Sequence, residues 1–251
     1  MTSTILATNG LIKRFGGLLA TDNVSLEIAT GELHAIIGPN GAGKTTLIRQ
    51  LSGEMRPTAG TVLLDGQDIT AQPMHRRSHM GLARSYQITS IFPDMTAREN
   101  VALAVQAHDG HSFRFWAPVA TDRRLAEPAA LALDQVGLGP RADIPANSLS
   151  HGEHRQLEIA MALATRPRLL LLDEPMAGMG PDESARMVAL LKTLKRNLTI
   201  VLIEHDMDAV FQLADRLTVL VYGRAIATGT PEAIRINREV RQAYLGDGHG
   251  G

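Results

Sequence analysis

The chain has 251 residues, a formal net charge of -1 and no cysteine. The balanced charge gives no electrostatic reason to expect nucleic acid as the main partner, and the lack of cysteine excludes disulfide bonds and thiolate metal sites. No apolar run approaches the roughly 18 residues of a membrane-spanning helix, and the first residues lack the basic and apolar regions of a signal peptide. We therefore expect a soluble globular protein with room for a buried core.

Short apolar runs alternate with helical patterns in the first part of the chain. Residues 24–28 alternate apolar and polar side chains with a period of two, which predicts a half-buried strand. Residues 33–37 predict a short buried strand that leads into a glycine-rich loop, and residues 44–51 predict the helix after that loop. Residues 61–64, followed by Asp65-Gly66, indicate a β-hairpin.

The glycine-rich loop, residues 38–45 (GPNGAGKT), fits the pattern G-x-x-x-x-G-K-[ST] at every fixed position. Its glycines let backbone N–H groups turn inward around phosphate oxygens, and the start of the helix favours negative charge. We expect Lys44 to reach the β- and γ-phosphates, the Thr45 hydroxyl to ligate Mg²⁺, and Thr46 to reach the α-phosphate. The predicted nucleotide-binding residues of this loop are Asn40, Gly41, Ala42, Gly43, Lys44, Thr45 and Thr46.

The middle of the chain, from about residue 93 to 166, has an almost entirely helical pattern. Thr96 and Glu99 have the spacing of a capping box and predict the start of one helix. Residues 152–164 predict a second helix with one apolar face. We interpret this segment as a helical subdomain inserted into an α/β core.

Strand patterns return at residues 169–172, 199–203 and 217–221. The first of these strands is followed by Asp173 and Glu174. In P-loop enzymes an acid at this strand end holds Mg²⁺, usually through water, and this is the role we expect for Asp173. Glu174 is placed to orient or deprotonate the attacking water. The alternation of strands and helices predicts a largely parallel sheet that is covered on both faces.

Between these two motifs lies the pentapeptide Leu149-Ser150-His151-Gly152-Glu153. With it, the chain resembles the ATP-binding cassette subunits of membrane transporters, whose signature motif usually reads LSGGQ. The resemblance covers nearly the whole chain and implies an α/β ATPase with a RecA-like P-loop NTPase core, a mostly parallel sheet, an N-terminal antiparallel β subdomain and an inserted α-helical subdomain. It implies a single domain, with the core at about 1–92 and 167–245, the helical subdomain at about 93–166 and a flexible tail at 246–251.

Three further residues take their expected roles from this resemblance. Phe15 stands where these proteins place an aromatic ring that stacks on adenine. Gln87 matches a glutamine that contacts Mg²⁺ and water and links the site to the membrane partner, and His205 matches a histidine that touches the γ-phosphate. ATP and Mg²⁺ are thus implied, with Glu174, His205, Gln87 and Lys44 as catalytic residues and Thr45, Gln87 and Asp173 as Mg²⁺ ligands.

The signature pentapeptide has a physical rationale. A serine hydroxyl, a glycine N–H and the start of a helix together form an anion site, and we expect Ser150 and Gly152 to precede a helix that begins near Glu153. In the family, this site closes on the γ-phosphate held by the other protomer, so that one chain carries two half-sites. Ser150, His151, Gly152 and Glu153 are therefore expected to contact the partner's ATP, and Ser150 can also act as an ordinary N-cap.

The chain departs from the family pattern at three positions. His151 stands where the signature usually has glycine and Glu153 where it has glutamine, and we expect both changes to be tolerated, because Ser150 and the Gly152 backbone can supply the phosphate donors. Gly180 stands where the family often has Asp or Asn, which leaves open whether a side chain contacts the partner across the dimer there.

A finer resemblance links residues 36–51, 157–164, 202–207 and 243–246, and an insertion at 108–121, to the ATPases of branched-chain amino-acid importers. It implies import of branched-chain or other hydrophobic amino acids at the cytoplasmic face of the plasma membrane. The implied partners are membrane permease subunits, a second ATPase subunit that is either identical or different, and indirectly a solute-binding protein. The alternatives are an importer for urea, amides or other small solutes, a lipopolysaccharide exporter and, more remotely, a cassette ATPase acting on ribosomes or DNA.

Two other patterns allow a simpler interpretation. His75 with His79, and His151 with His154, have spacings compatible with metal binding, but neither pair has an obvious third ligand nearby, so we expect no metal there. The segment Phe113–Trp116 concentrates aromatic residues in one loop. This loop either packs onto the helical subdomain or forms an exposed apolar patch for a membrane subunit.

Overall fold

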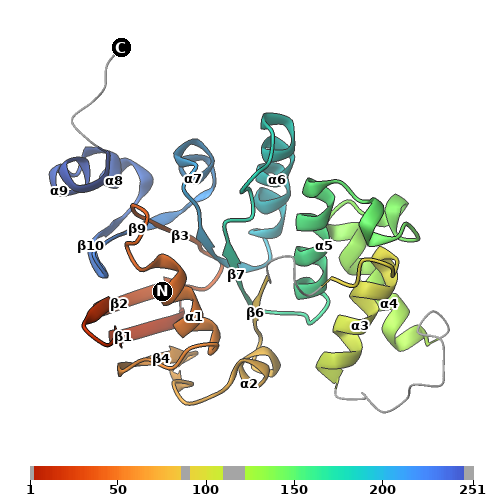
Figure 1. Ribbon diagram of the computed structural model, residues 1–251, viewed down its shortest axis with the longest axis horizontal. Helices are drawn as coiled ribbons and strands as arrows, with labels where there is room; N and C mark the ends of the chain where they lie inside the picture. The colour runs from red at the N-terminus through yellow and green to blue at the C-terminus, as the bar shows by residue number, and fades with distance from the viewer. Residues whose placement is uncertain (1–2, 86–90, 110–121, 246–251) are drawn as a thin grey trace.

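The fold is described from a computed structural model, which describes residues 3–85, 91–109 and 122–245 (Figure 1). The expectations for Gln87, for Phe113–Trp116 and for the tail at 246–251 lie outside the described residues. The strands are β1 (Thr4–Phe15), β2 (Leu18–Ala29), β3 (Leu33–Ile37), β4 (Ala59–Leu64), β5 (Gln67–Asp68), β6 (Leu82–Arg84), β7 (Leu169–Asp173), β8 (Thr199–Ile203), β9 (Arg216–Val221) and β10 (Arg224–Gly229). The helices are α1 (Lys44–Ser52), α2 (Met74–His79), α3 (Ala97–Asp109), α4 (Arg123–Gln135), α5 (His151–Leu163), α6 (Pro181–Leu194), α7 (Met207–Leu213), α8 (Pro231–Ile236) and α9 (Arg238–Val240), with short helical turns at Gly139–Arg141, Ala146–Ser148 and Arg241–Leu245.

The central sheet has six strands in the order β10-β9-β3-β8-β7-β6. Its strands run parallel except for the edge strand β10, which pairs antiparallel with β9. Successive side chains of β3 point to opposite faces, since Ala35 and Ile37 join one buried cluster while Ile36 joins the other. Both faces are therefore covered, which explains why the strands are mainly apolar along their length and confirms the predicted sheet.

A second sheet, in the order β2-β1-β4-β5, is antiparallel. The turn between β4 and β5 falls at Asp65-Gly66, as the sequence predicts. Helix α1 places Leu47, Ile48 and Leu51 in the same buried cluster as side chains of both sheets. This helix therefore joins the antiparallel sheet to one face of the central sheet.

The helices α3, α4 and α5 lie together beyond β6, on the side of the molecule away from α8 and α9 (Figure 1). Val101, Leu133 and Leu157, one from each helix, are fully buried. At the start of α3, Glu99 accepts the Thr96 N–H at 2.8 Å and donates its own N–H to the Thr96 hydroxyl at 3.2 Å, which confirms the predicted capping box. The inserted α-helical subdomain is thus present.

One predicted boundary is wrong. The helix expected to begin near Glu153 begins at His151, so Gly152 lies inside its first turn instead of preceding it. The reason is local, because Ser150 caps the helix by accepting the N–H of Glu153, and this fixes the first helical residue directly after the serine.

The parallel strands bring three distant parts of the chain to one edge. Ile203 at the end of β8 pairs with Ile36 on one side and with Asp173 on the other. The glycine-rich loop, the acidic pair and His205 therefore follow the carboxyl ends of three adjacent strands, the usual position of a ligand site in such sheets. Among the helices that the structure describes, none has both the length and the hydrophobicity needed to cross a bilayer.

Candidate functional site

The loop after β3 is held tightly by its neighbours. A Cβ atom added to Gly38 would lie 2.0 Å from the carbonyl oxygen of Leu220. One added to Gly43 would lie 2.1 Å from the carbonyl oxygen of Ala20, so only glycine fits at either position. At Gly41 the same construction meets no atom within 4 Å. The loop is thus packed against β9 at Gly38 and against β2 at Gly43 but open at Gly41, which suits a backbone cradle for phosphate.

Lys44 opens α1 at the end of this loop and is only 6% exposed. Its Nζ donates to the carbonyl oxygens of Gly38 at 2.7 Å and Pro39 at 3.1 Å. Burial lowers the pKa of Lys44, whereas the carboxylates of Glu174 and Asp173 raise it. Phosphate oxygens are stronger acceptors than carbonyls because they carry charge, so this ammonium can exchange its present partners for phosphate.

Asp173 is the last residue of β7 and is 7% exposed. Burial raises its pKa, while the guanidinium of Arg84 lowers it. Arg84 Nη2 lies 3.1 Å from Asp173 Oδ2, and Arg84 Nη1 pairs with Glu54. The Asp173 carboxylate and the hydroxyl of Thr45, exposed on the first turn of α1, are the hard oxygen donors that Mg²⁺ prefers. The residues present therefore fit a Mg²⁺ ion.

Three titratable side chains meet where β7 and β8 end. His205 Nδ1 lies 3.9 Å from Glu174 Oε1 and 3.8 Å from Glu204 Oε2. The structure thus brings together two side chains that the sequence named as catalytic, Glu174 and His205. It adds a third, Glu204, which is only 1% exposed and to which the sequence analysis gave no role.

Comparisons with known proteins identify the family of this chain. Residues 21–177 match the family profile "ABC transporter". The chain belongs to the ATP-binding cassette family. Residues 226–250 also match the profile "Branched-chain amino acid ATP-binding cassette transporter". The cassette is therefore an ATP-hydrolysing subunit of a membrane transporter.

Individual relatives agree with the family profile. The cassette is 42% identical over 254 residues to BraF of Pseudomonas aeruginosa, a high-affinity branched-chain amino acid transport ATP-binding protein, with 98% of this chain and 100% of the relative covered. Among solved structures, it resembles the ADP conformation of MJ1267, an ATP-binding cassette of an ABC transporter. That match has a TM-score of 0.87 and 30% identity, and covers 98% of this chain and 100% of the other.

A third match concerns assembly. The dimeric post-hydrolysis state of the ATP-binding cassette MJ0796, bound to ADP and Pi, matches with a TM-score of 0.75 and 25% identity, and covers 90% of this chain and 99% of that chain. Cassettes of this family dimerise and work with membrane permeases, so a single cassette is expected to expose a surface that a second one completes.

The signature residues lie at the start of α5. Ser150 Oγ accepts the Glu153 N–H at 3.2 Å, and the Glu153 carboxylate accepts the Ser150 N–H at 2.8 Å. Arg141 pairs with the same carboxylate at 3.0 Å, which gives the glutamate a partner of opposite charge at a position that is usually glutamine. A groove of about 420 Å³ borders Ser150, Gly152 and Met179, so the start of α5 is accessible from outside the chain.

His151, the unusual residue of the signature, faces its own chain. Its Nε2 donates to the carbonyl oxygen of Ala177 at 3.0 Å, in the loop that follows Glu174. The His151 side chain is exposed, and none of its hydrogen bonds within the described residues reaches the phosphate loop of the same cassette. Our expectation that His151 is tolerated in place of glycine stays a prediction.

In each histidine pair, at least one member has a hydrogen-bonding or stacking partner outside the pair. The rings of His79 and His108 stack with their centroids 4.6 Å apart, and His154 Nε2 donates to the Ala146 carbonyl at 2.6 Å. Within the described ranges, no group of three or more His, Cys, Asp or Glu side chains is arranged to hold a metal ion.

Phe15 ends β1 and remains 45% exposed. It pairs across the hairpin with Leu18, and farther along β2 the carbonyl of Ala20 touches the phosphate loop at Gly43. Lys13 Nζ lies 5.3 Å from the centroid of the Phe15 ring. An exposed aromatic ring on a hairpin that contacts the phosphate loop suits adenine stacking.

Replacing Phe15 with alanine is expected to raise the dissociation constant of ATP by about 5- to 150-fold, because stacking of a base on an aromatic ring contributes about 1–3 kcal/mol. Calorimetric titration of the purified cassette with a slowly hydrolysed ATP analogue measures this effect. Leu18→Ala, which removes an exposed side chain (66% exposed) from the same hairpin, is the matched control. Equal affinities for Phe15→Ala and the wild type would exclude the stacking role.

Proposed function

We propose that this cassette supplies the energy for import of branched-chain or other hydrophobic amino acids. The proposed solute class rests on the match of residues 226–250 to the branched-chain profile. The likeness to BraF along nearly the whole chain supports it. The cassette itself does not select the solute. That selection belongs to the membrane subunits and to a solute-binding protein outside the membrane.

In the proposed reaction, the groups at the edge of the central sheet act on bound ATP. Lys44 donates to the β- and γ-phosphate oxygens in place of its present carbonyl partners, and Phe15 stacks on the adenine. Glu174 orients a water molecule and takes its proton as the water oxygen bonds to the γ-phosphorus, and the bond to the bridging oxygen of ADP breaks. His205, beside Glu174, donates to the γ-phosphate as its charge redistributes.

Mg²⁺, when bound, would neutralise part of the phosphate charge, and Thr45, Asp173 and Gln87 are its proposed ligands. Arg84 supports this role by fixing the Asp173 carboxylate from one side through the 3.1 Å contact between Nη2 and Oδ2.

The signature is proposed to act on the partner's ATP. The Ser150 hydroxyl, the Gly152 N–H and the start of α5 provide donors and a favourable field for the γ-phosphate bound to the opposite cassette, and His151 and Glu153 flank them. Two cassettes, identical or different, would therefore sandwich two ATP molecules and separate after hydrolysis.

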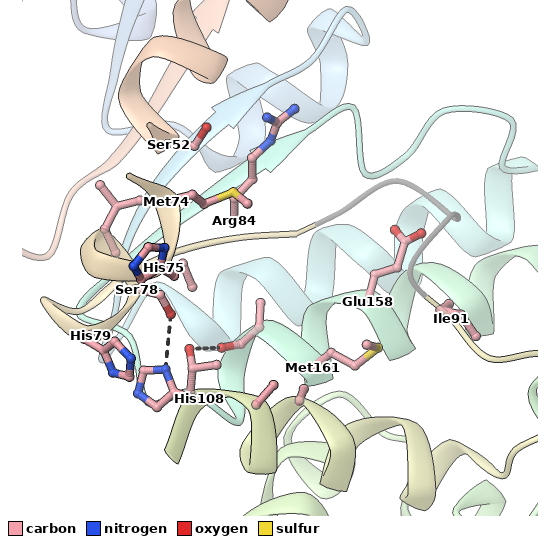
Figure 2. A pocket seen from close by; sticks show the side chains of 16 residues that line it. Ser52, Met74, His75, Ser78, His79, Arg84, Ile91, His108, Glu158 and Met161 are labelled. Atoms are coloured by element: carbon pink, nitrogen blue, oxygen red, sulfur yellow. Dashed lines mark hydrogen bonds between the residues drawn. The ribbon is translucent and has the colours of Figure 1, made fainter. Parts of the chain in front are cut away.

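The proposed contact with the permease is a groove of about 300 Å³ between α2 and β6 on one side and α3 and α5 on the other (Figure 2). Its lining is mainly apolar and includes Met74, Ala107 and Met161. Arg84 and Ile91, which flank the segment that contains Gln87, also line it. A groove so placed can transmit movement of an inserted permease segment to the ATP site. We propose that the cassette binds there at the cytoplasmic face of the plasma membrane.

Ala107→Arg is expected to block this groove, because Ala107 is an exposed helical residue on its wall and a long charged side chain would occupy the apolar space. Co-purification of the permease subunits should fall at least about tenfold, while ATP affinity stays unchanged. Ala189→Arg places the same charge on an exposed position of α6, outside the groove, and is the control. Wild-type recovery of the permease with Ala107→Arg would contradict this docking site.

Uptake measurements in cells test the proposed solute. Deleting the gene should abolish high-affinity uptake of labelled leucine, and unlabelled isoleucine or valine should compete with leucine in the complemented strain. Competition by urea or amides instead would identify a related importer. A lipopolysaccharide export defect with normal leucine uptake would identify an exporter, and recovery of the tagged cassette with ribosomes or DNA would remove it from transport.

A further inference from the structure

We propose that Glu204 is a positioning residue for ATP hydrolysis. Its buried carboxylate fixes the loop after Glu174 and the backbone of His205 in one arrangement. This inference rests on the roles proposed above for Glu174 and His205.

The carboxylate of Glu204 joins two segments that lie far apart in the chain. Oε1 accepts the N–H of Met176 at 2.8 Å, and Oε2 accepts the N–H of His205 at 3.1 Å. Met176 lies two residues after Glu174, and Glu204 directly precedes His205. One side chain therefore sets the distance between the backbones that carry both proposed catalytic groups.

The backbone of Glu174 needs such support. Its φ of 50° is in the left-handed region, which a non-glycine residue adopts only where the surroundings enforce it. Two contacts from the end of β8 hold this turn: the Ile203 carbonyl accepts the Glu174 N–H at 2.9 Å, and Glu204 accepts that of Met176. Without the second contact, the turn that aims the Glu174 carboxylate would be less well fixed.

The side chain at position 204 accepts two hydrogen bonds, one on each oxygen. Among side chains as long as glutamate, only a carboxylate offers two acceptor oxygens. A glutamine has one carbonyl oxygen and one NH₂ group, so one of the two backbone N–H groups would face another donor. Aspartate keeps the charge but is one methylene shorter and cannot span both donors from the same backbone position. Burying the Glu204 carboxylate also costs free energy. Burial raises the pKa of Glu204, and the hydrogen bonds from the Met176 and His205 N–H groups lower it.

Glu204→Gln and Glu204→Asp in the full chain, measured within the assembled transporter, test this inference. We expect kcat to fall about 10- to 100-fold, since a displacement of about 1 Å at a reacting group has effects of this size. The dissociation constant of ATP should stay within about twofold of the wild-type value, because the phosphate loop and Phe15 are untouched. Glu32→Gln is the matched control, because Glu32 is a buried acid, 7% exposed, that accepts the Ala29 N–H at the opposite end of β3.

A double-mutant cycle separates positioning from general damage. If Glu204 acts through Glu174 and His205, then adding Glu204→Gln to a chain that already carries Glu174→Gln and His205→Ala should lower the residual rate by less than about twofold. Full multiplication of the two effects would overturn the inference, and so would a Glu204→Gln enzyme with wild-type kcat. A parallel loss of ATP affinity and kcat in both Glu204 variants would show a merely structural role.

Failure of the role proposed for Glu174 would give different results from failure of the role proposed for Glu204. If Glu174→Gln keeps wild-type turnover, the assigned base is wrong, whatever the Glu204 variants do. If Glu174→Gln is inactive while both Glu204 variants are fully active and folded, only the role of Glu204 is rejected. Should Glu204→Gln fail to fold, the charged Glu204→Asp variant gives the deciding kcat.

Discussion

Glu174→Gln is expected to bind ATP normally and to hydrolyse it about 10²–10⁴-fold more slowly than the wild type, the usual contribution of a general base. Glutamine keeps the size of the side chain but cannot accept the proton of the attacking water. The strained backbone at this position does not depend on the side-chain charge, so the site should keep its shape. Single-turnover measurement of phosphate release gives the rate directly.

The same variant should also stabilise the dimer. With hydrolysis blocked, both phosphate loops should stay loaded, and each γ-phosphate should stay between Lys44 of one cassette and Ser150 of the other, as proposed above. Size-exclusion chromatography with light scattering should show an ATP-dependent dimer that persists in Glu174→Gln. Glu127→Gln, an exposed acid on α4, is the control. Turnover of Glu174→Gln within a few-fold of the wild-type rate would refute the assigned role.

Lys44→Ala is expected to weaken ATP binding by at least about 100-fold. Hydrogen bonds to charged groups contribute about 1.5–3 kcal/mol each, and this ammonium should reach two phosphates. The loss should be specific to nucleotide binding, because the hydrogen bonds of Nζ to the described residues go to the carbonyls of Gly38 and Pro39 in its own loop.

Melting temperatures of Lys44→Ala with and without ATP test this prediction. The melting temperature without nucleotide should match that of the wild type, and the stabilisation by ATP should disappear. Lys192→Ala, at an exposed position of α6, removes the same charge elsewhere and should keep the ATP-dependent shift. An undiminished shift in Lys44→Ala would mean that the phosphates bind somewhere other than this loop.

Much of the fold could be predicted because its signals are local. The strands β3, β7 and β8 are buried on both faces and appear in the sequence as mainly apolar runs. Strand β6 could not be predicted, because it has only the three residues Leu82–Arg84 and is defined by its pairing with β7. Strand β1 likewise gives no clean alternation, because bulges interrupt its pairing with both neighbours.

The candidate site divides in the same way. The glycine loop, Asp173-Glu174 and the signature each lie within a few consecutive residues, so a pattern finds them. Arg84 and Glu204 act over long separations: Arg84 reaches Asp173, 89 residues away, and Glu204 reaches Met176, 28 residues away. An acid at the end of an apolar strand, as in Ile203-Glu204, was the one available signal for the second contact, since a buried carboxylate needs partners.

The most direct test of the account is ATP-driven accumulation of leucine in proteoliposomes that contain the complete transporter with this cassette. We expect accumulation against a gradient when ATP is present on the cassette side, and none when the cassette is Glu174→Gln, although that complex should still assemble and bind ATP. Equal leucine accumulation with the wild-type and Glu174→Gln cassettes would contradict the claim that hydrolysis at this site drives transport.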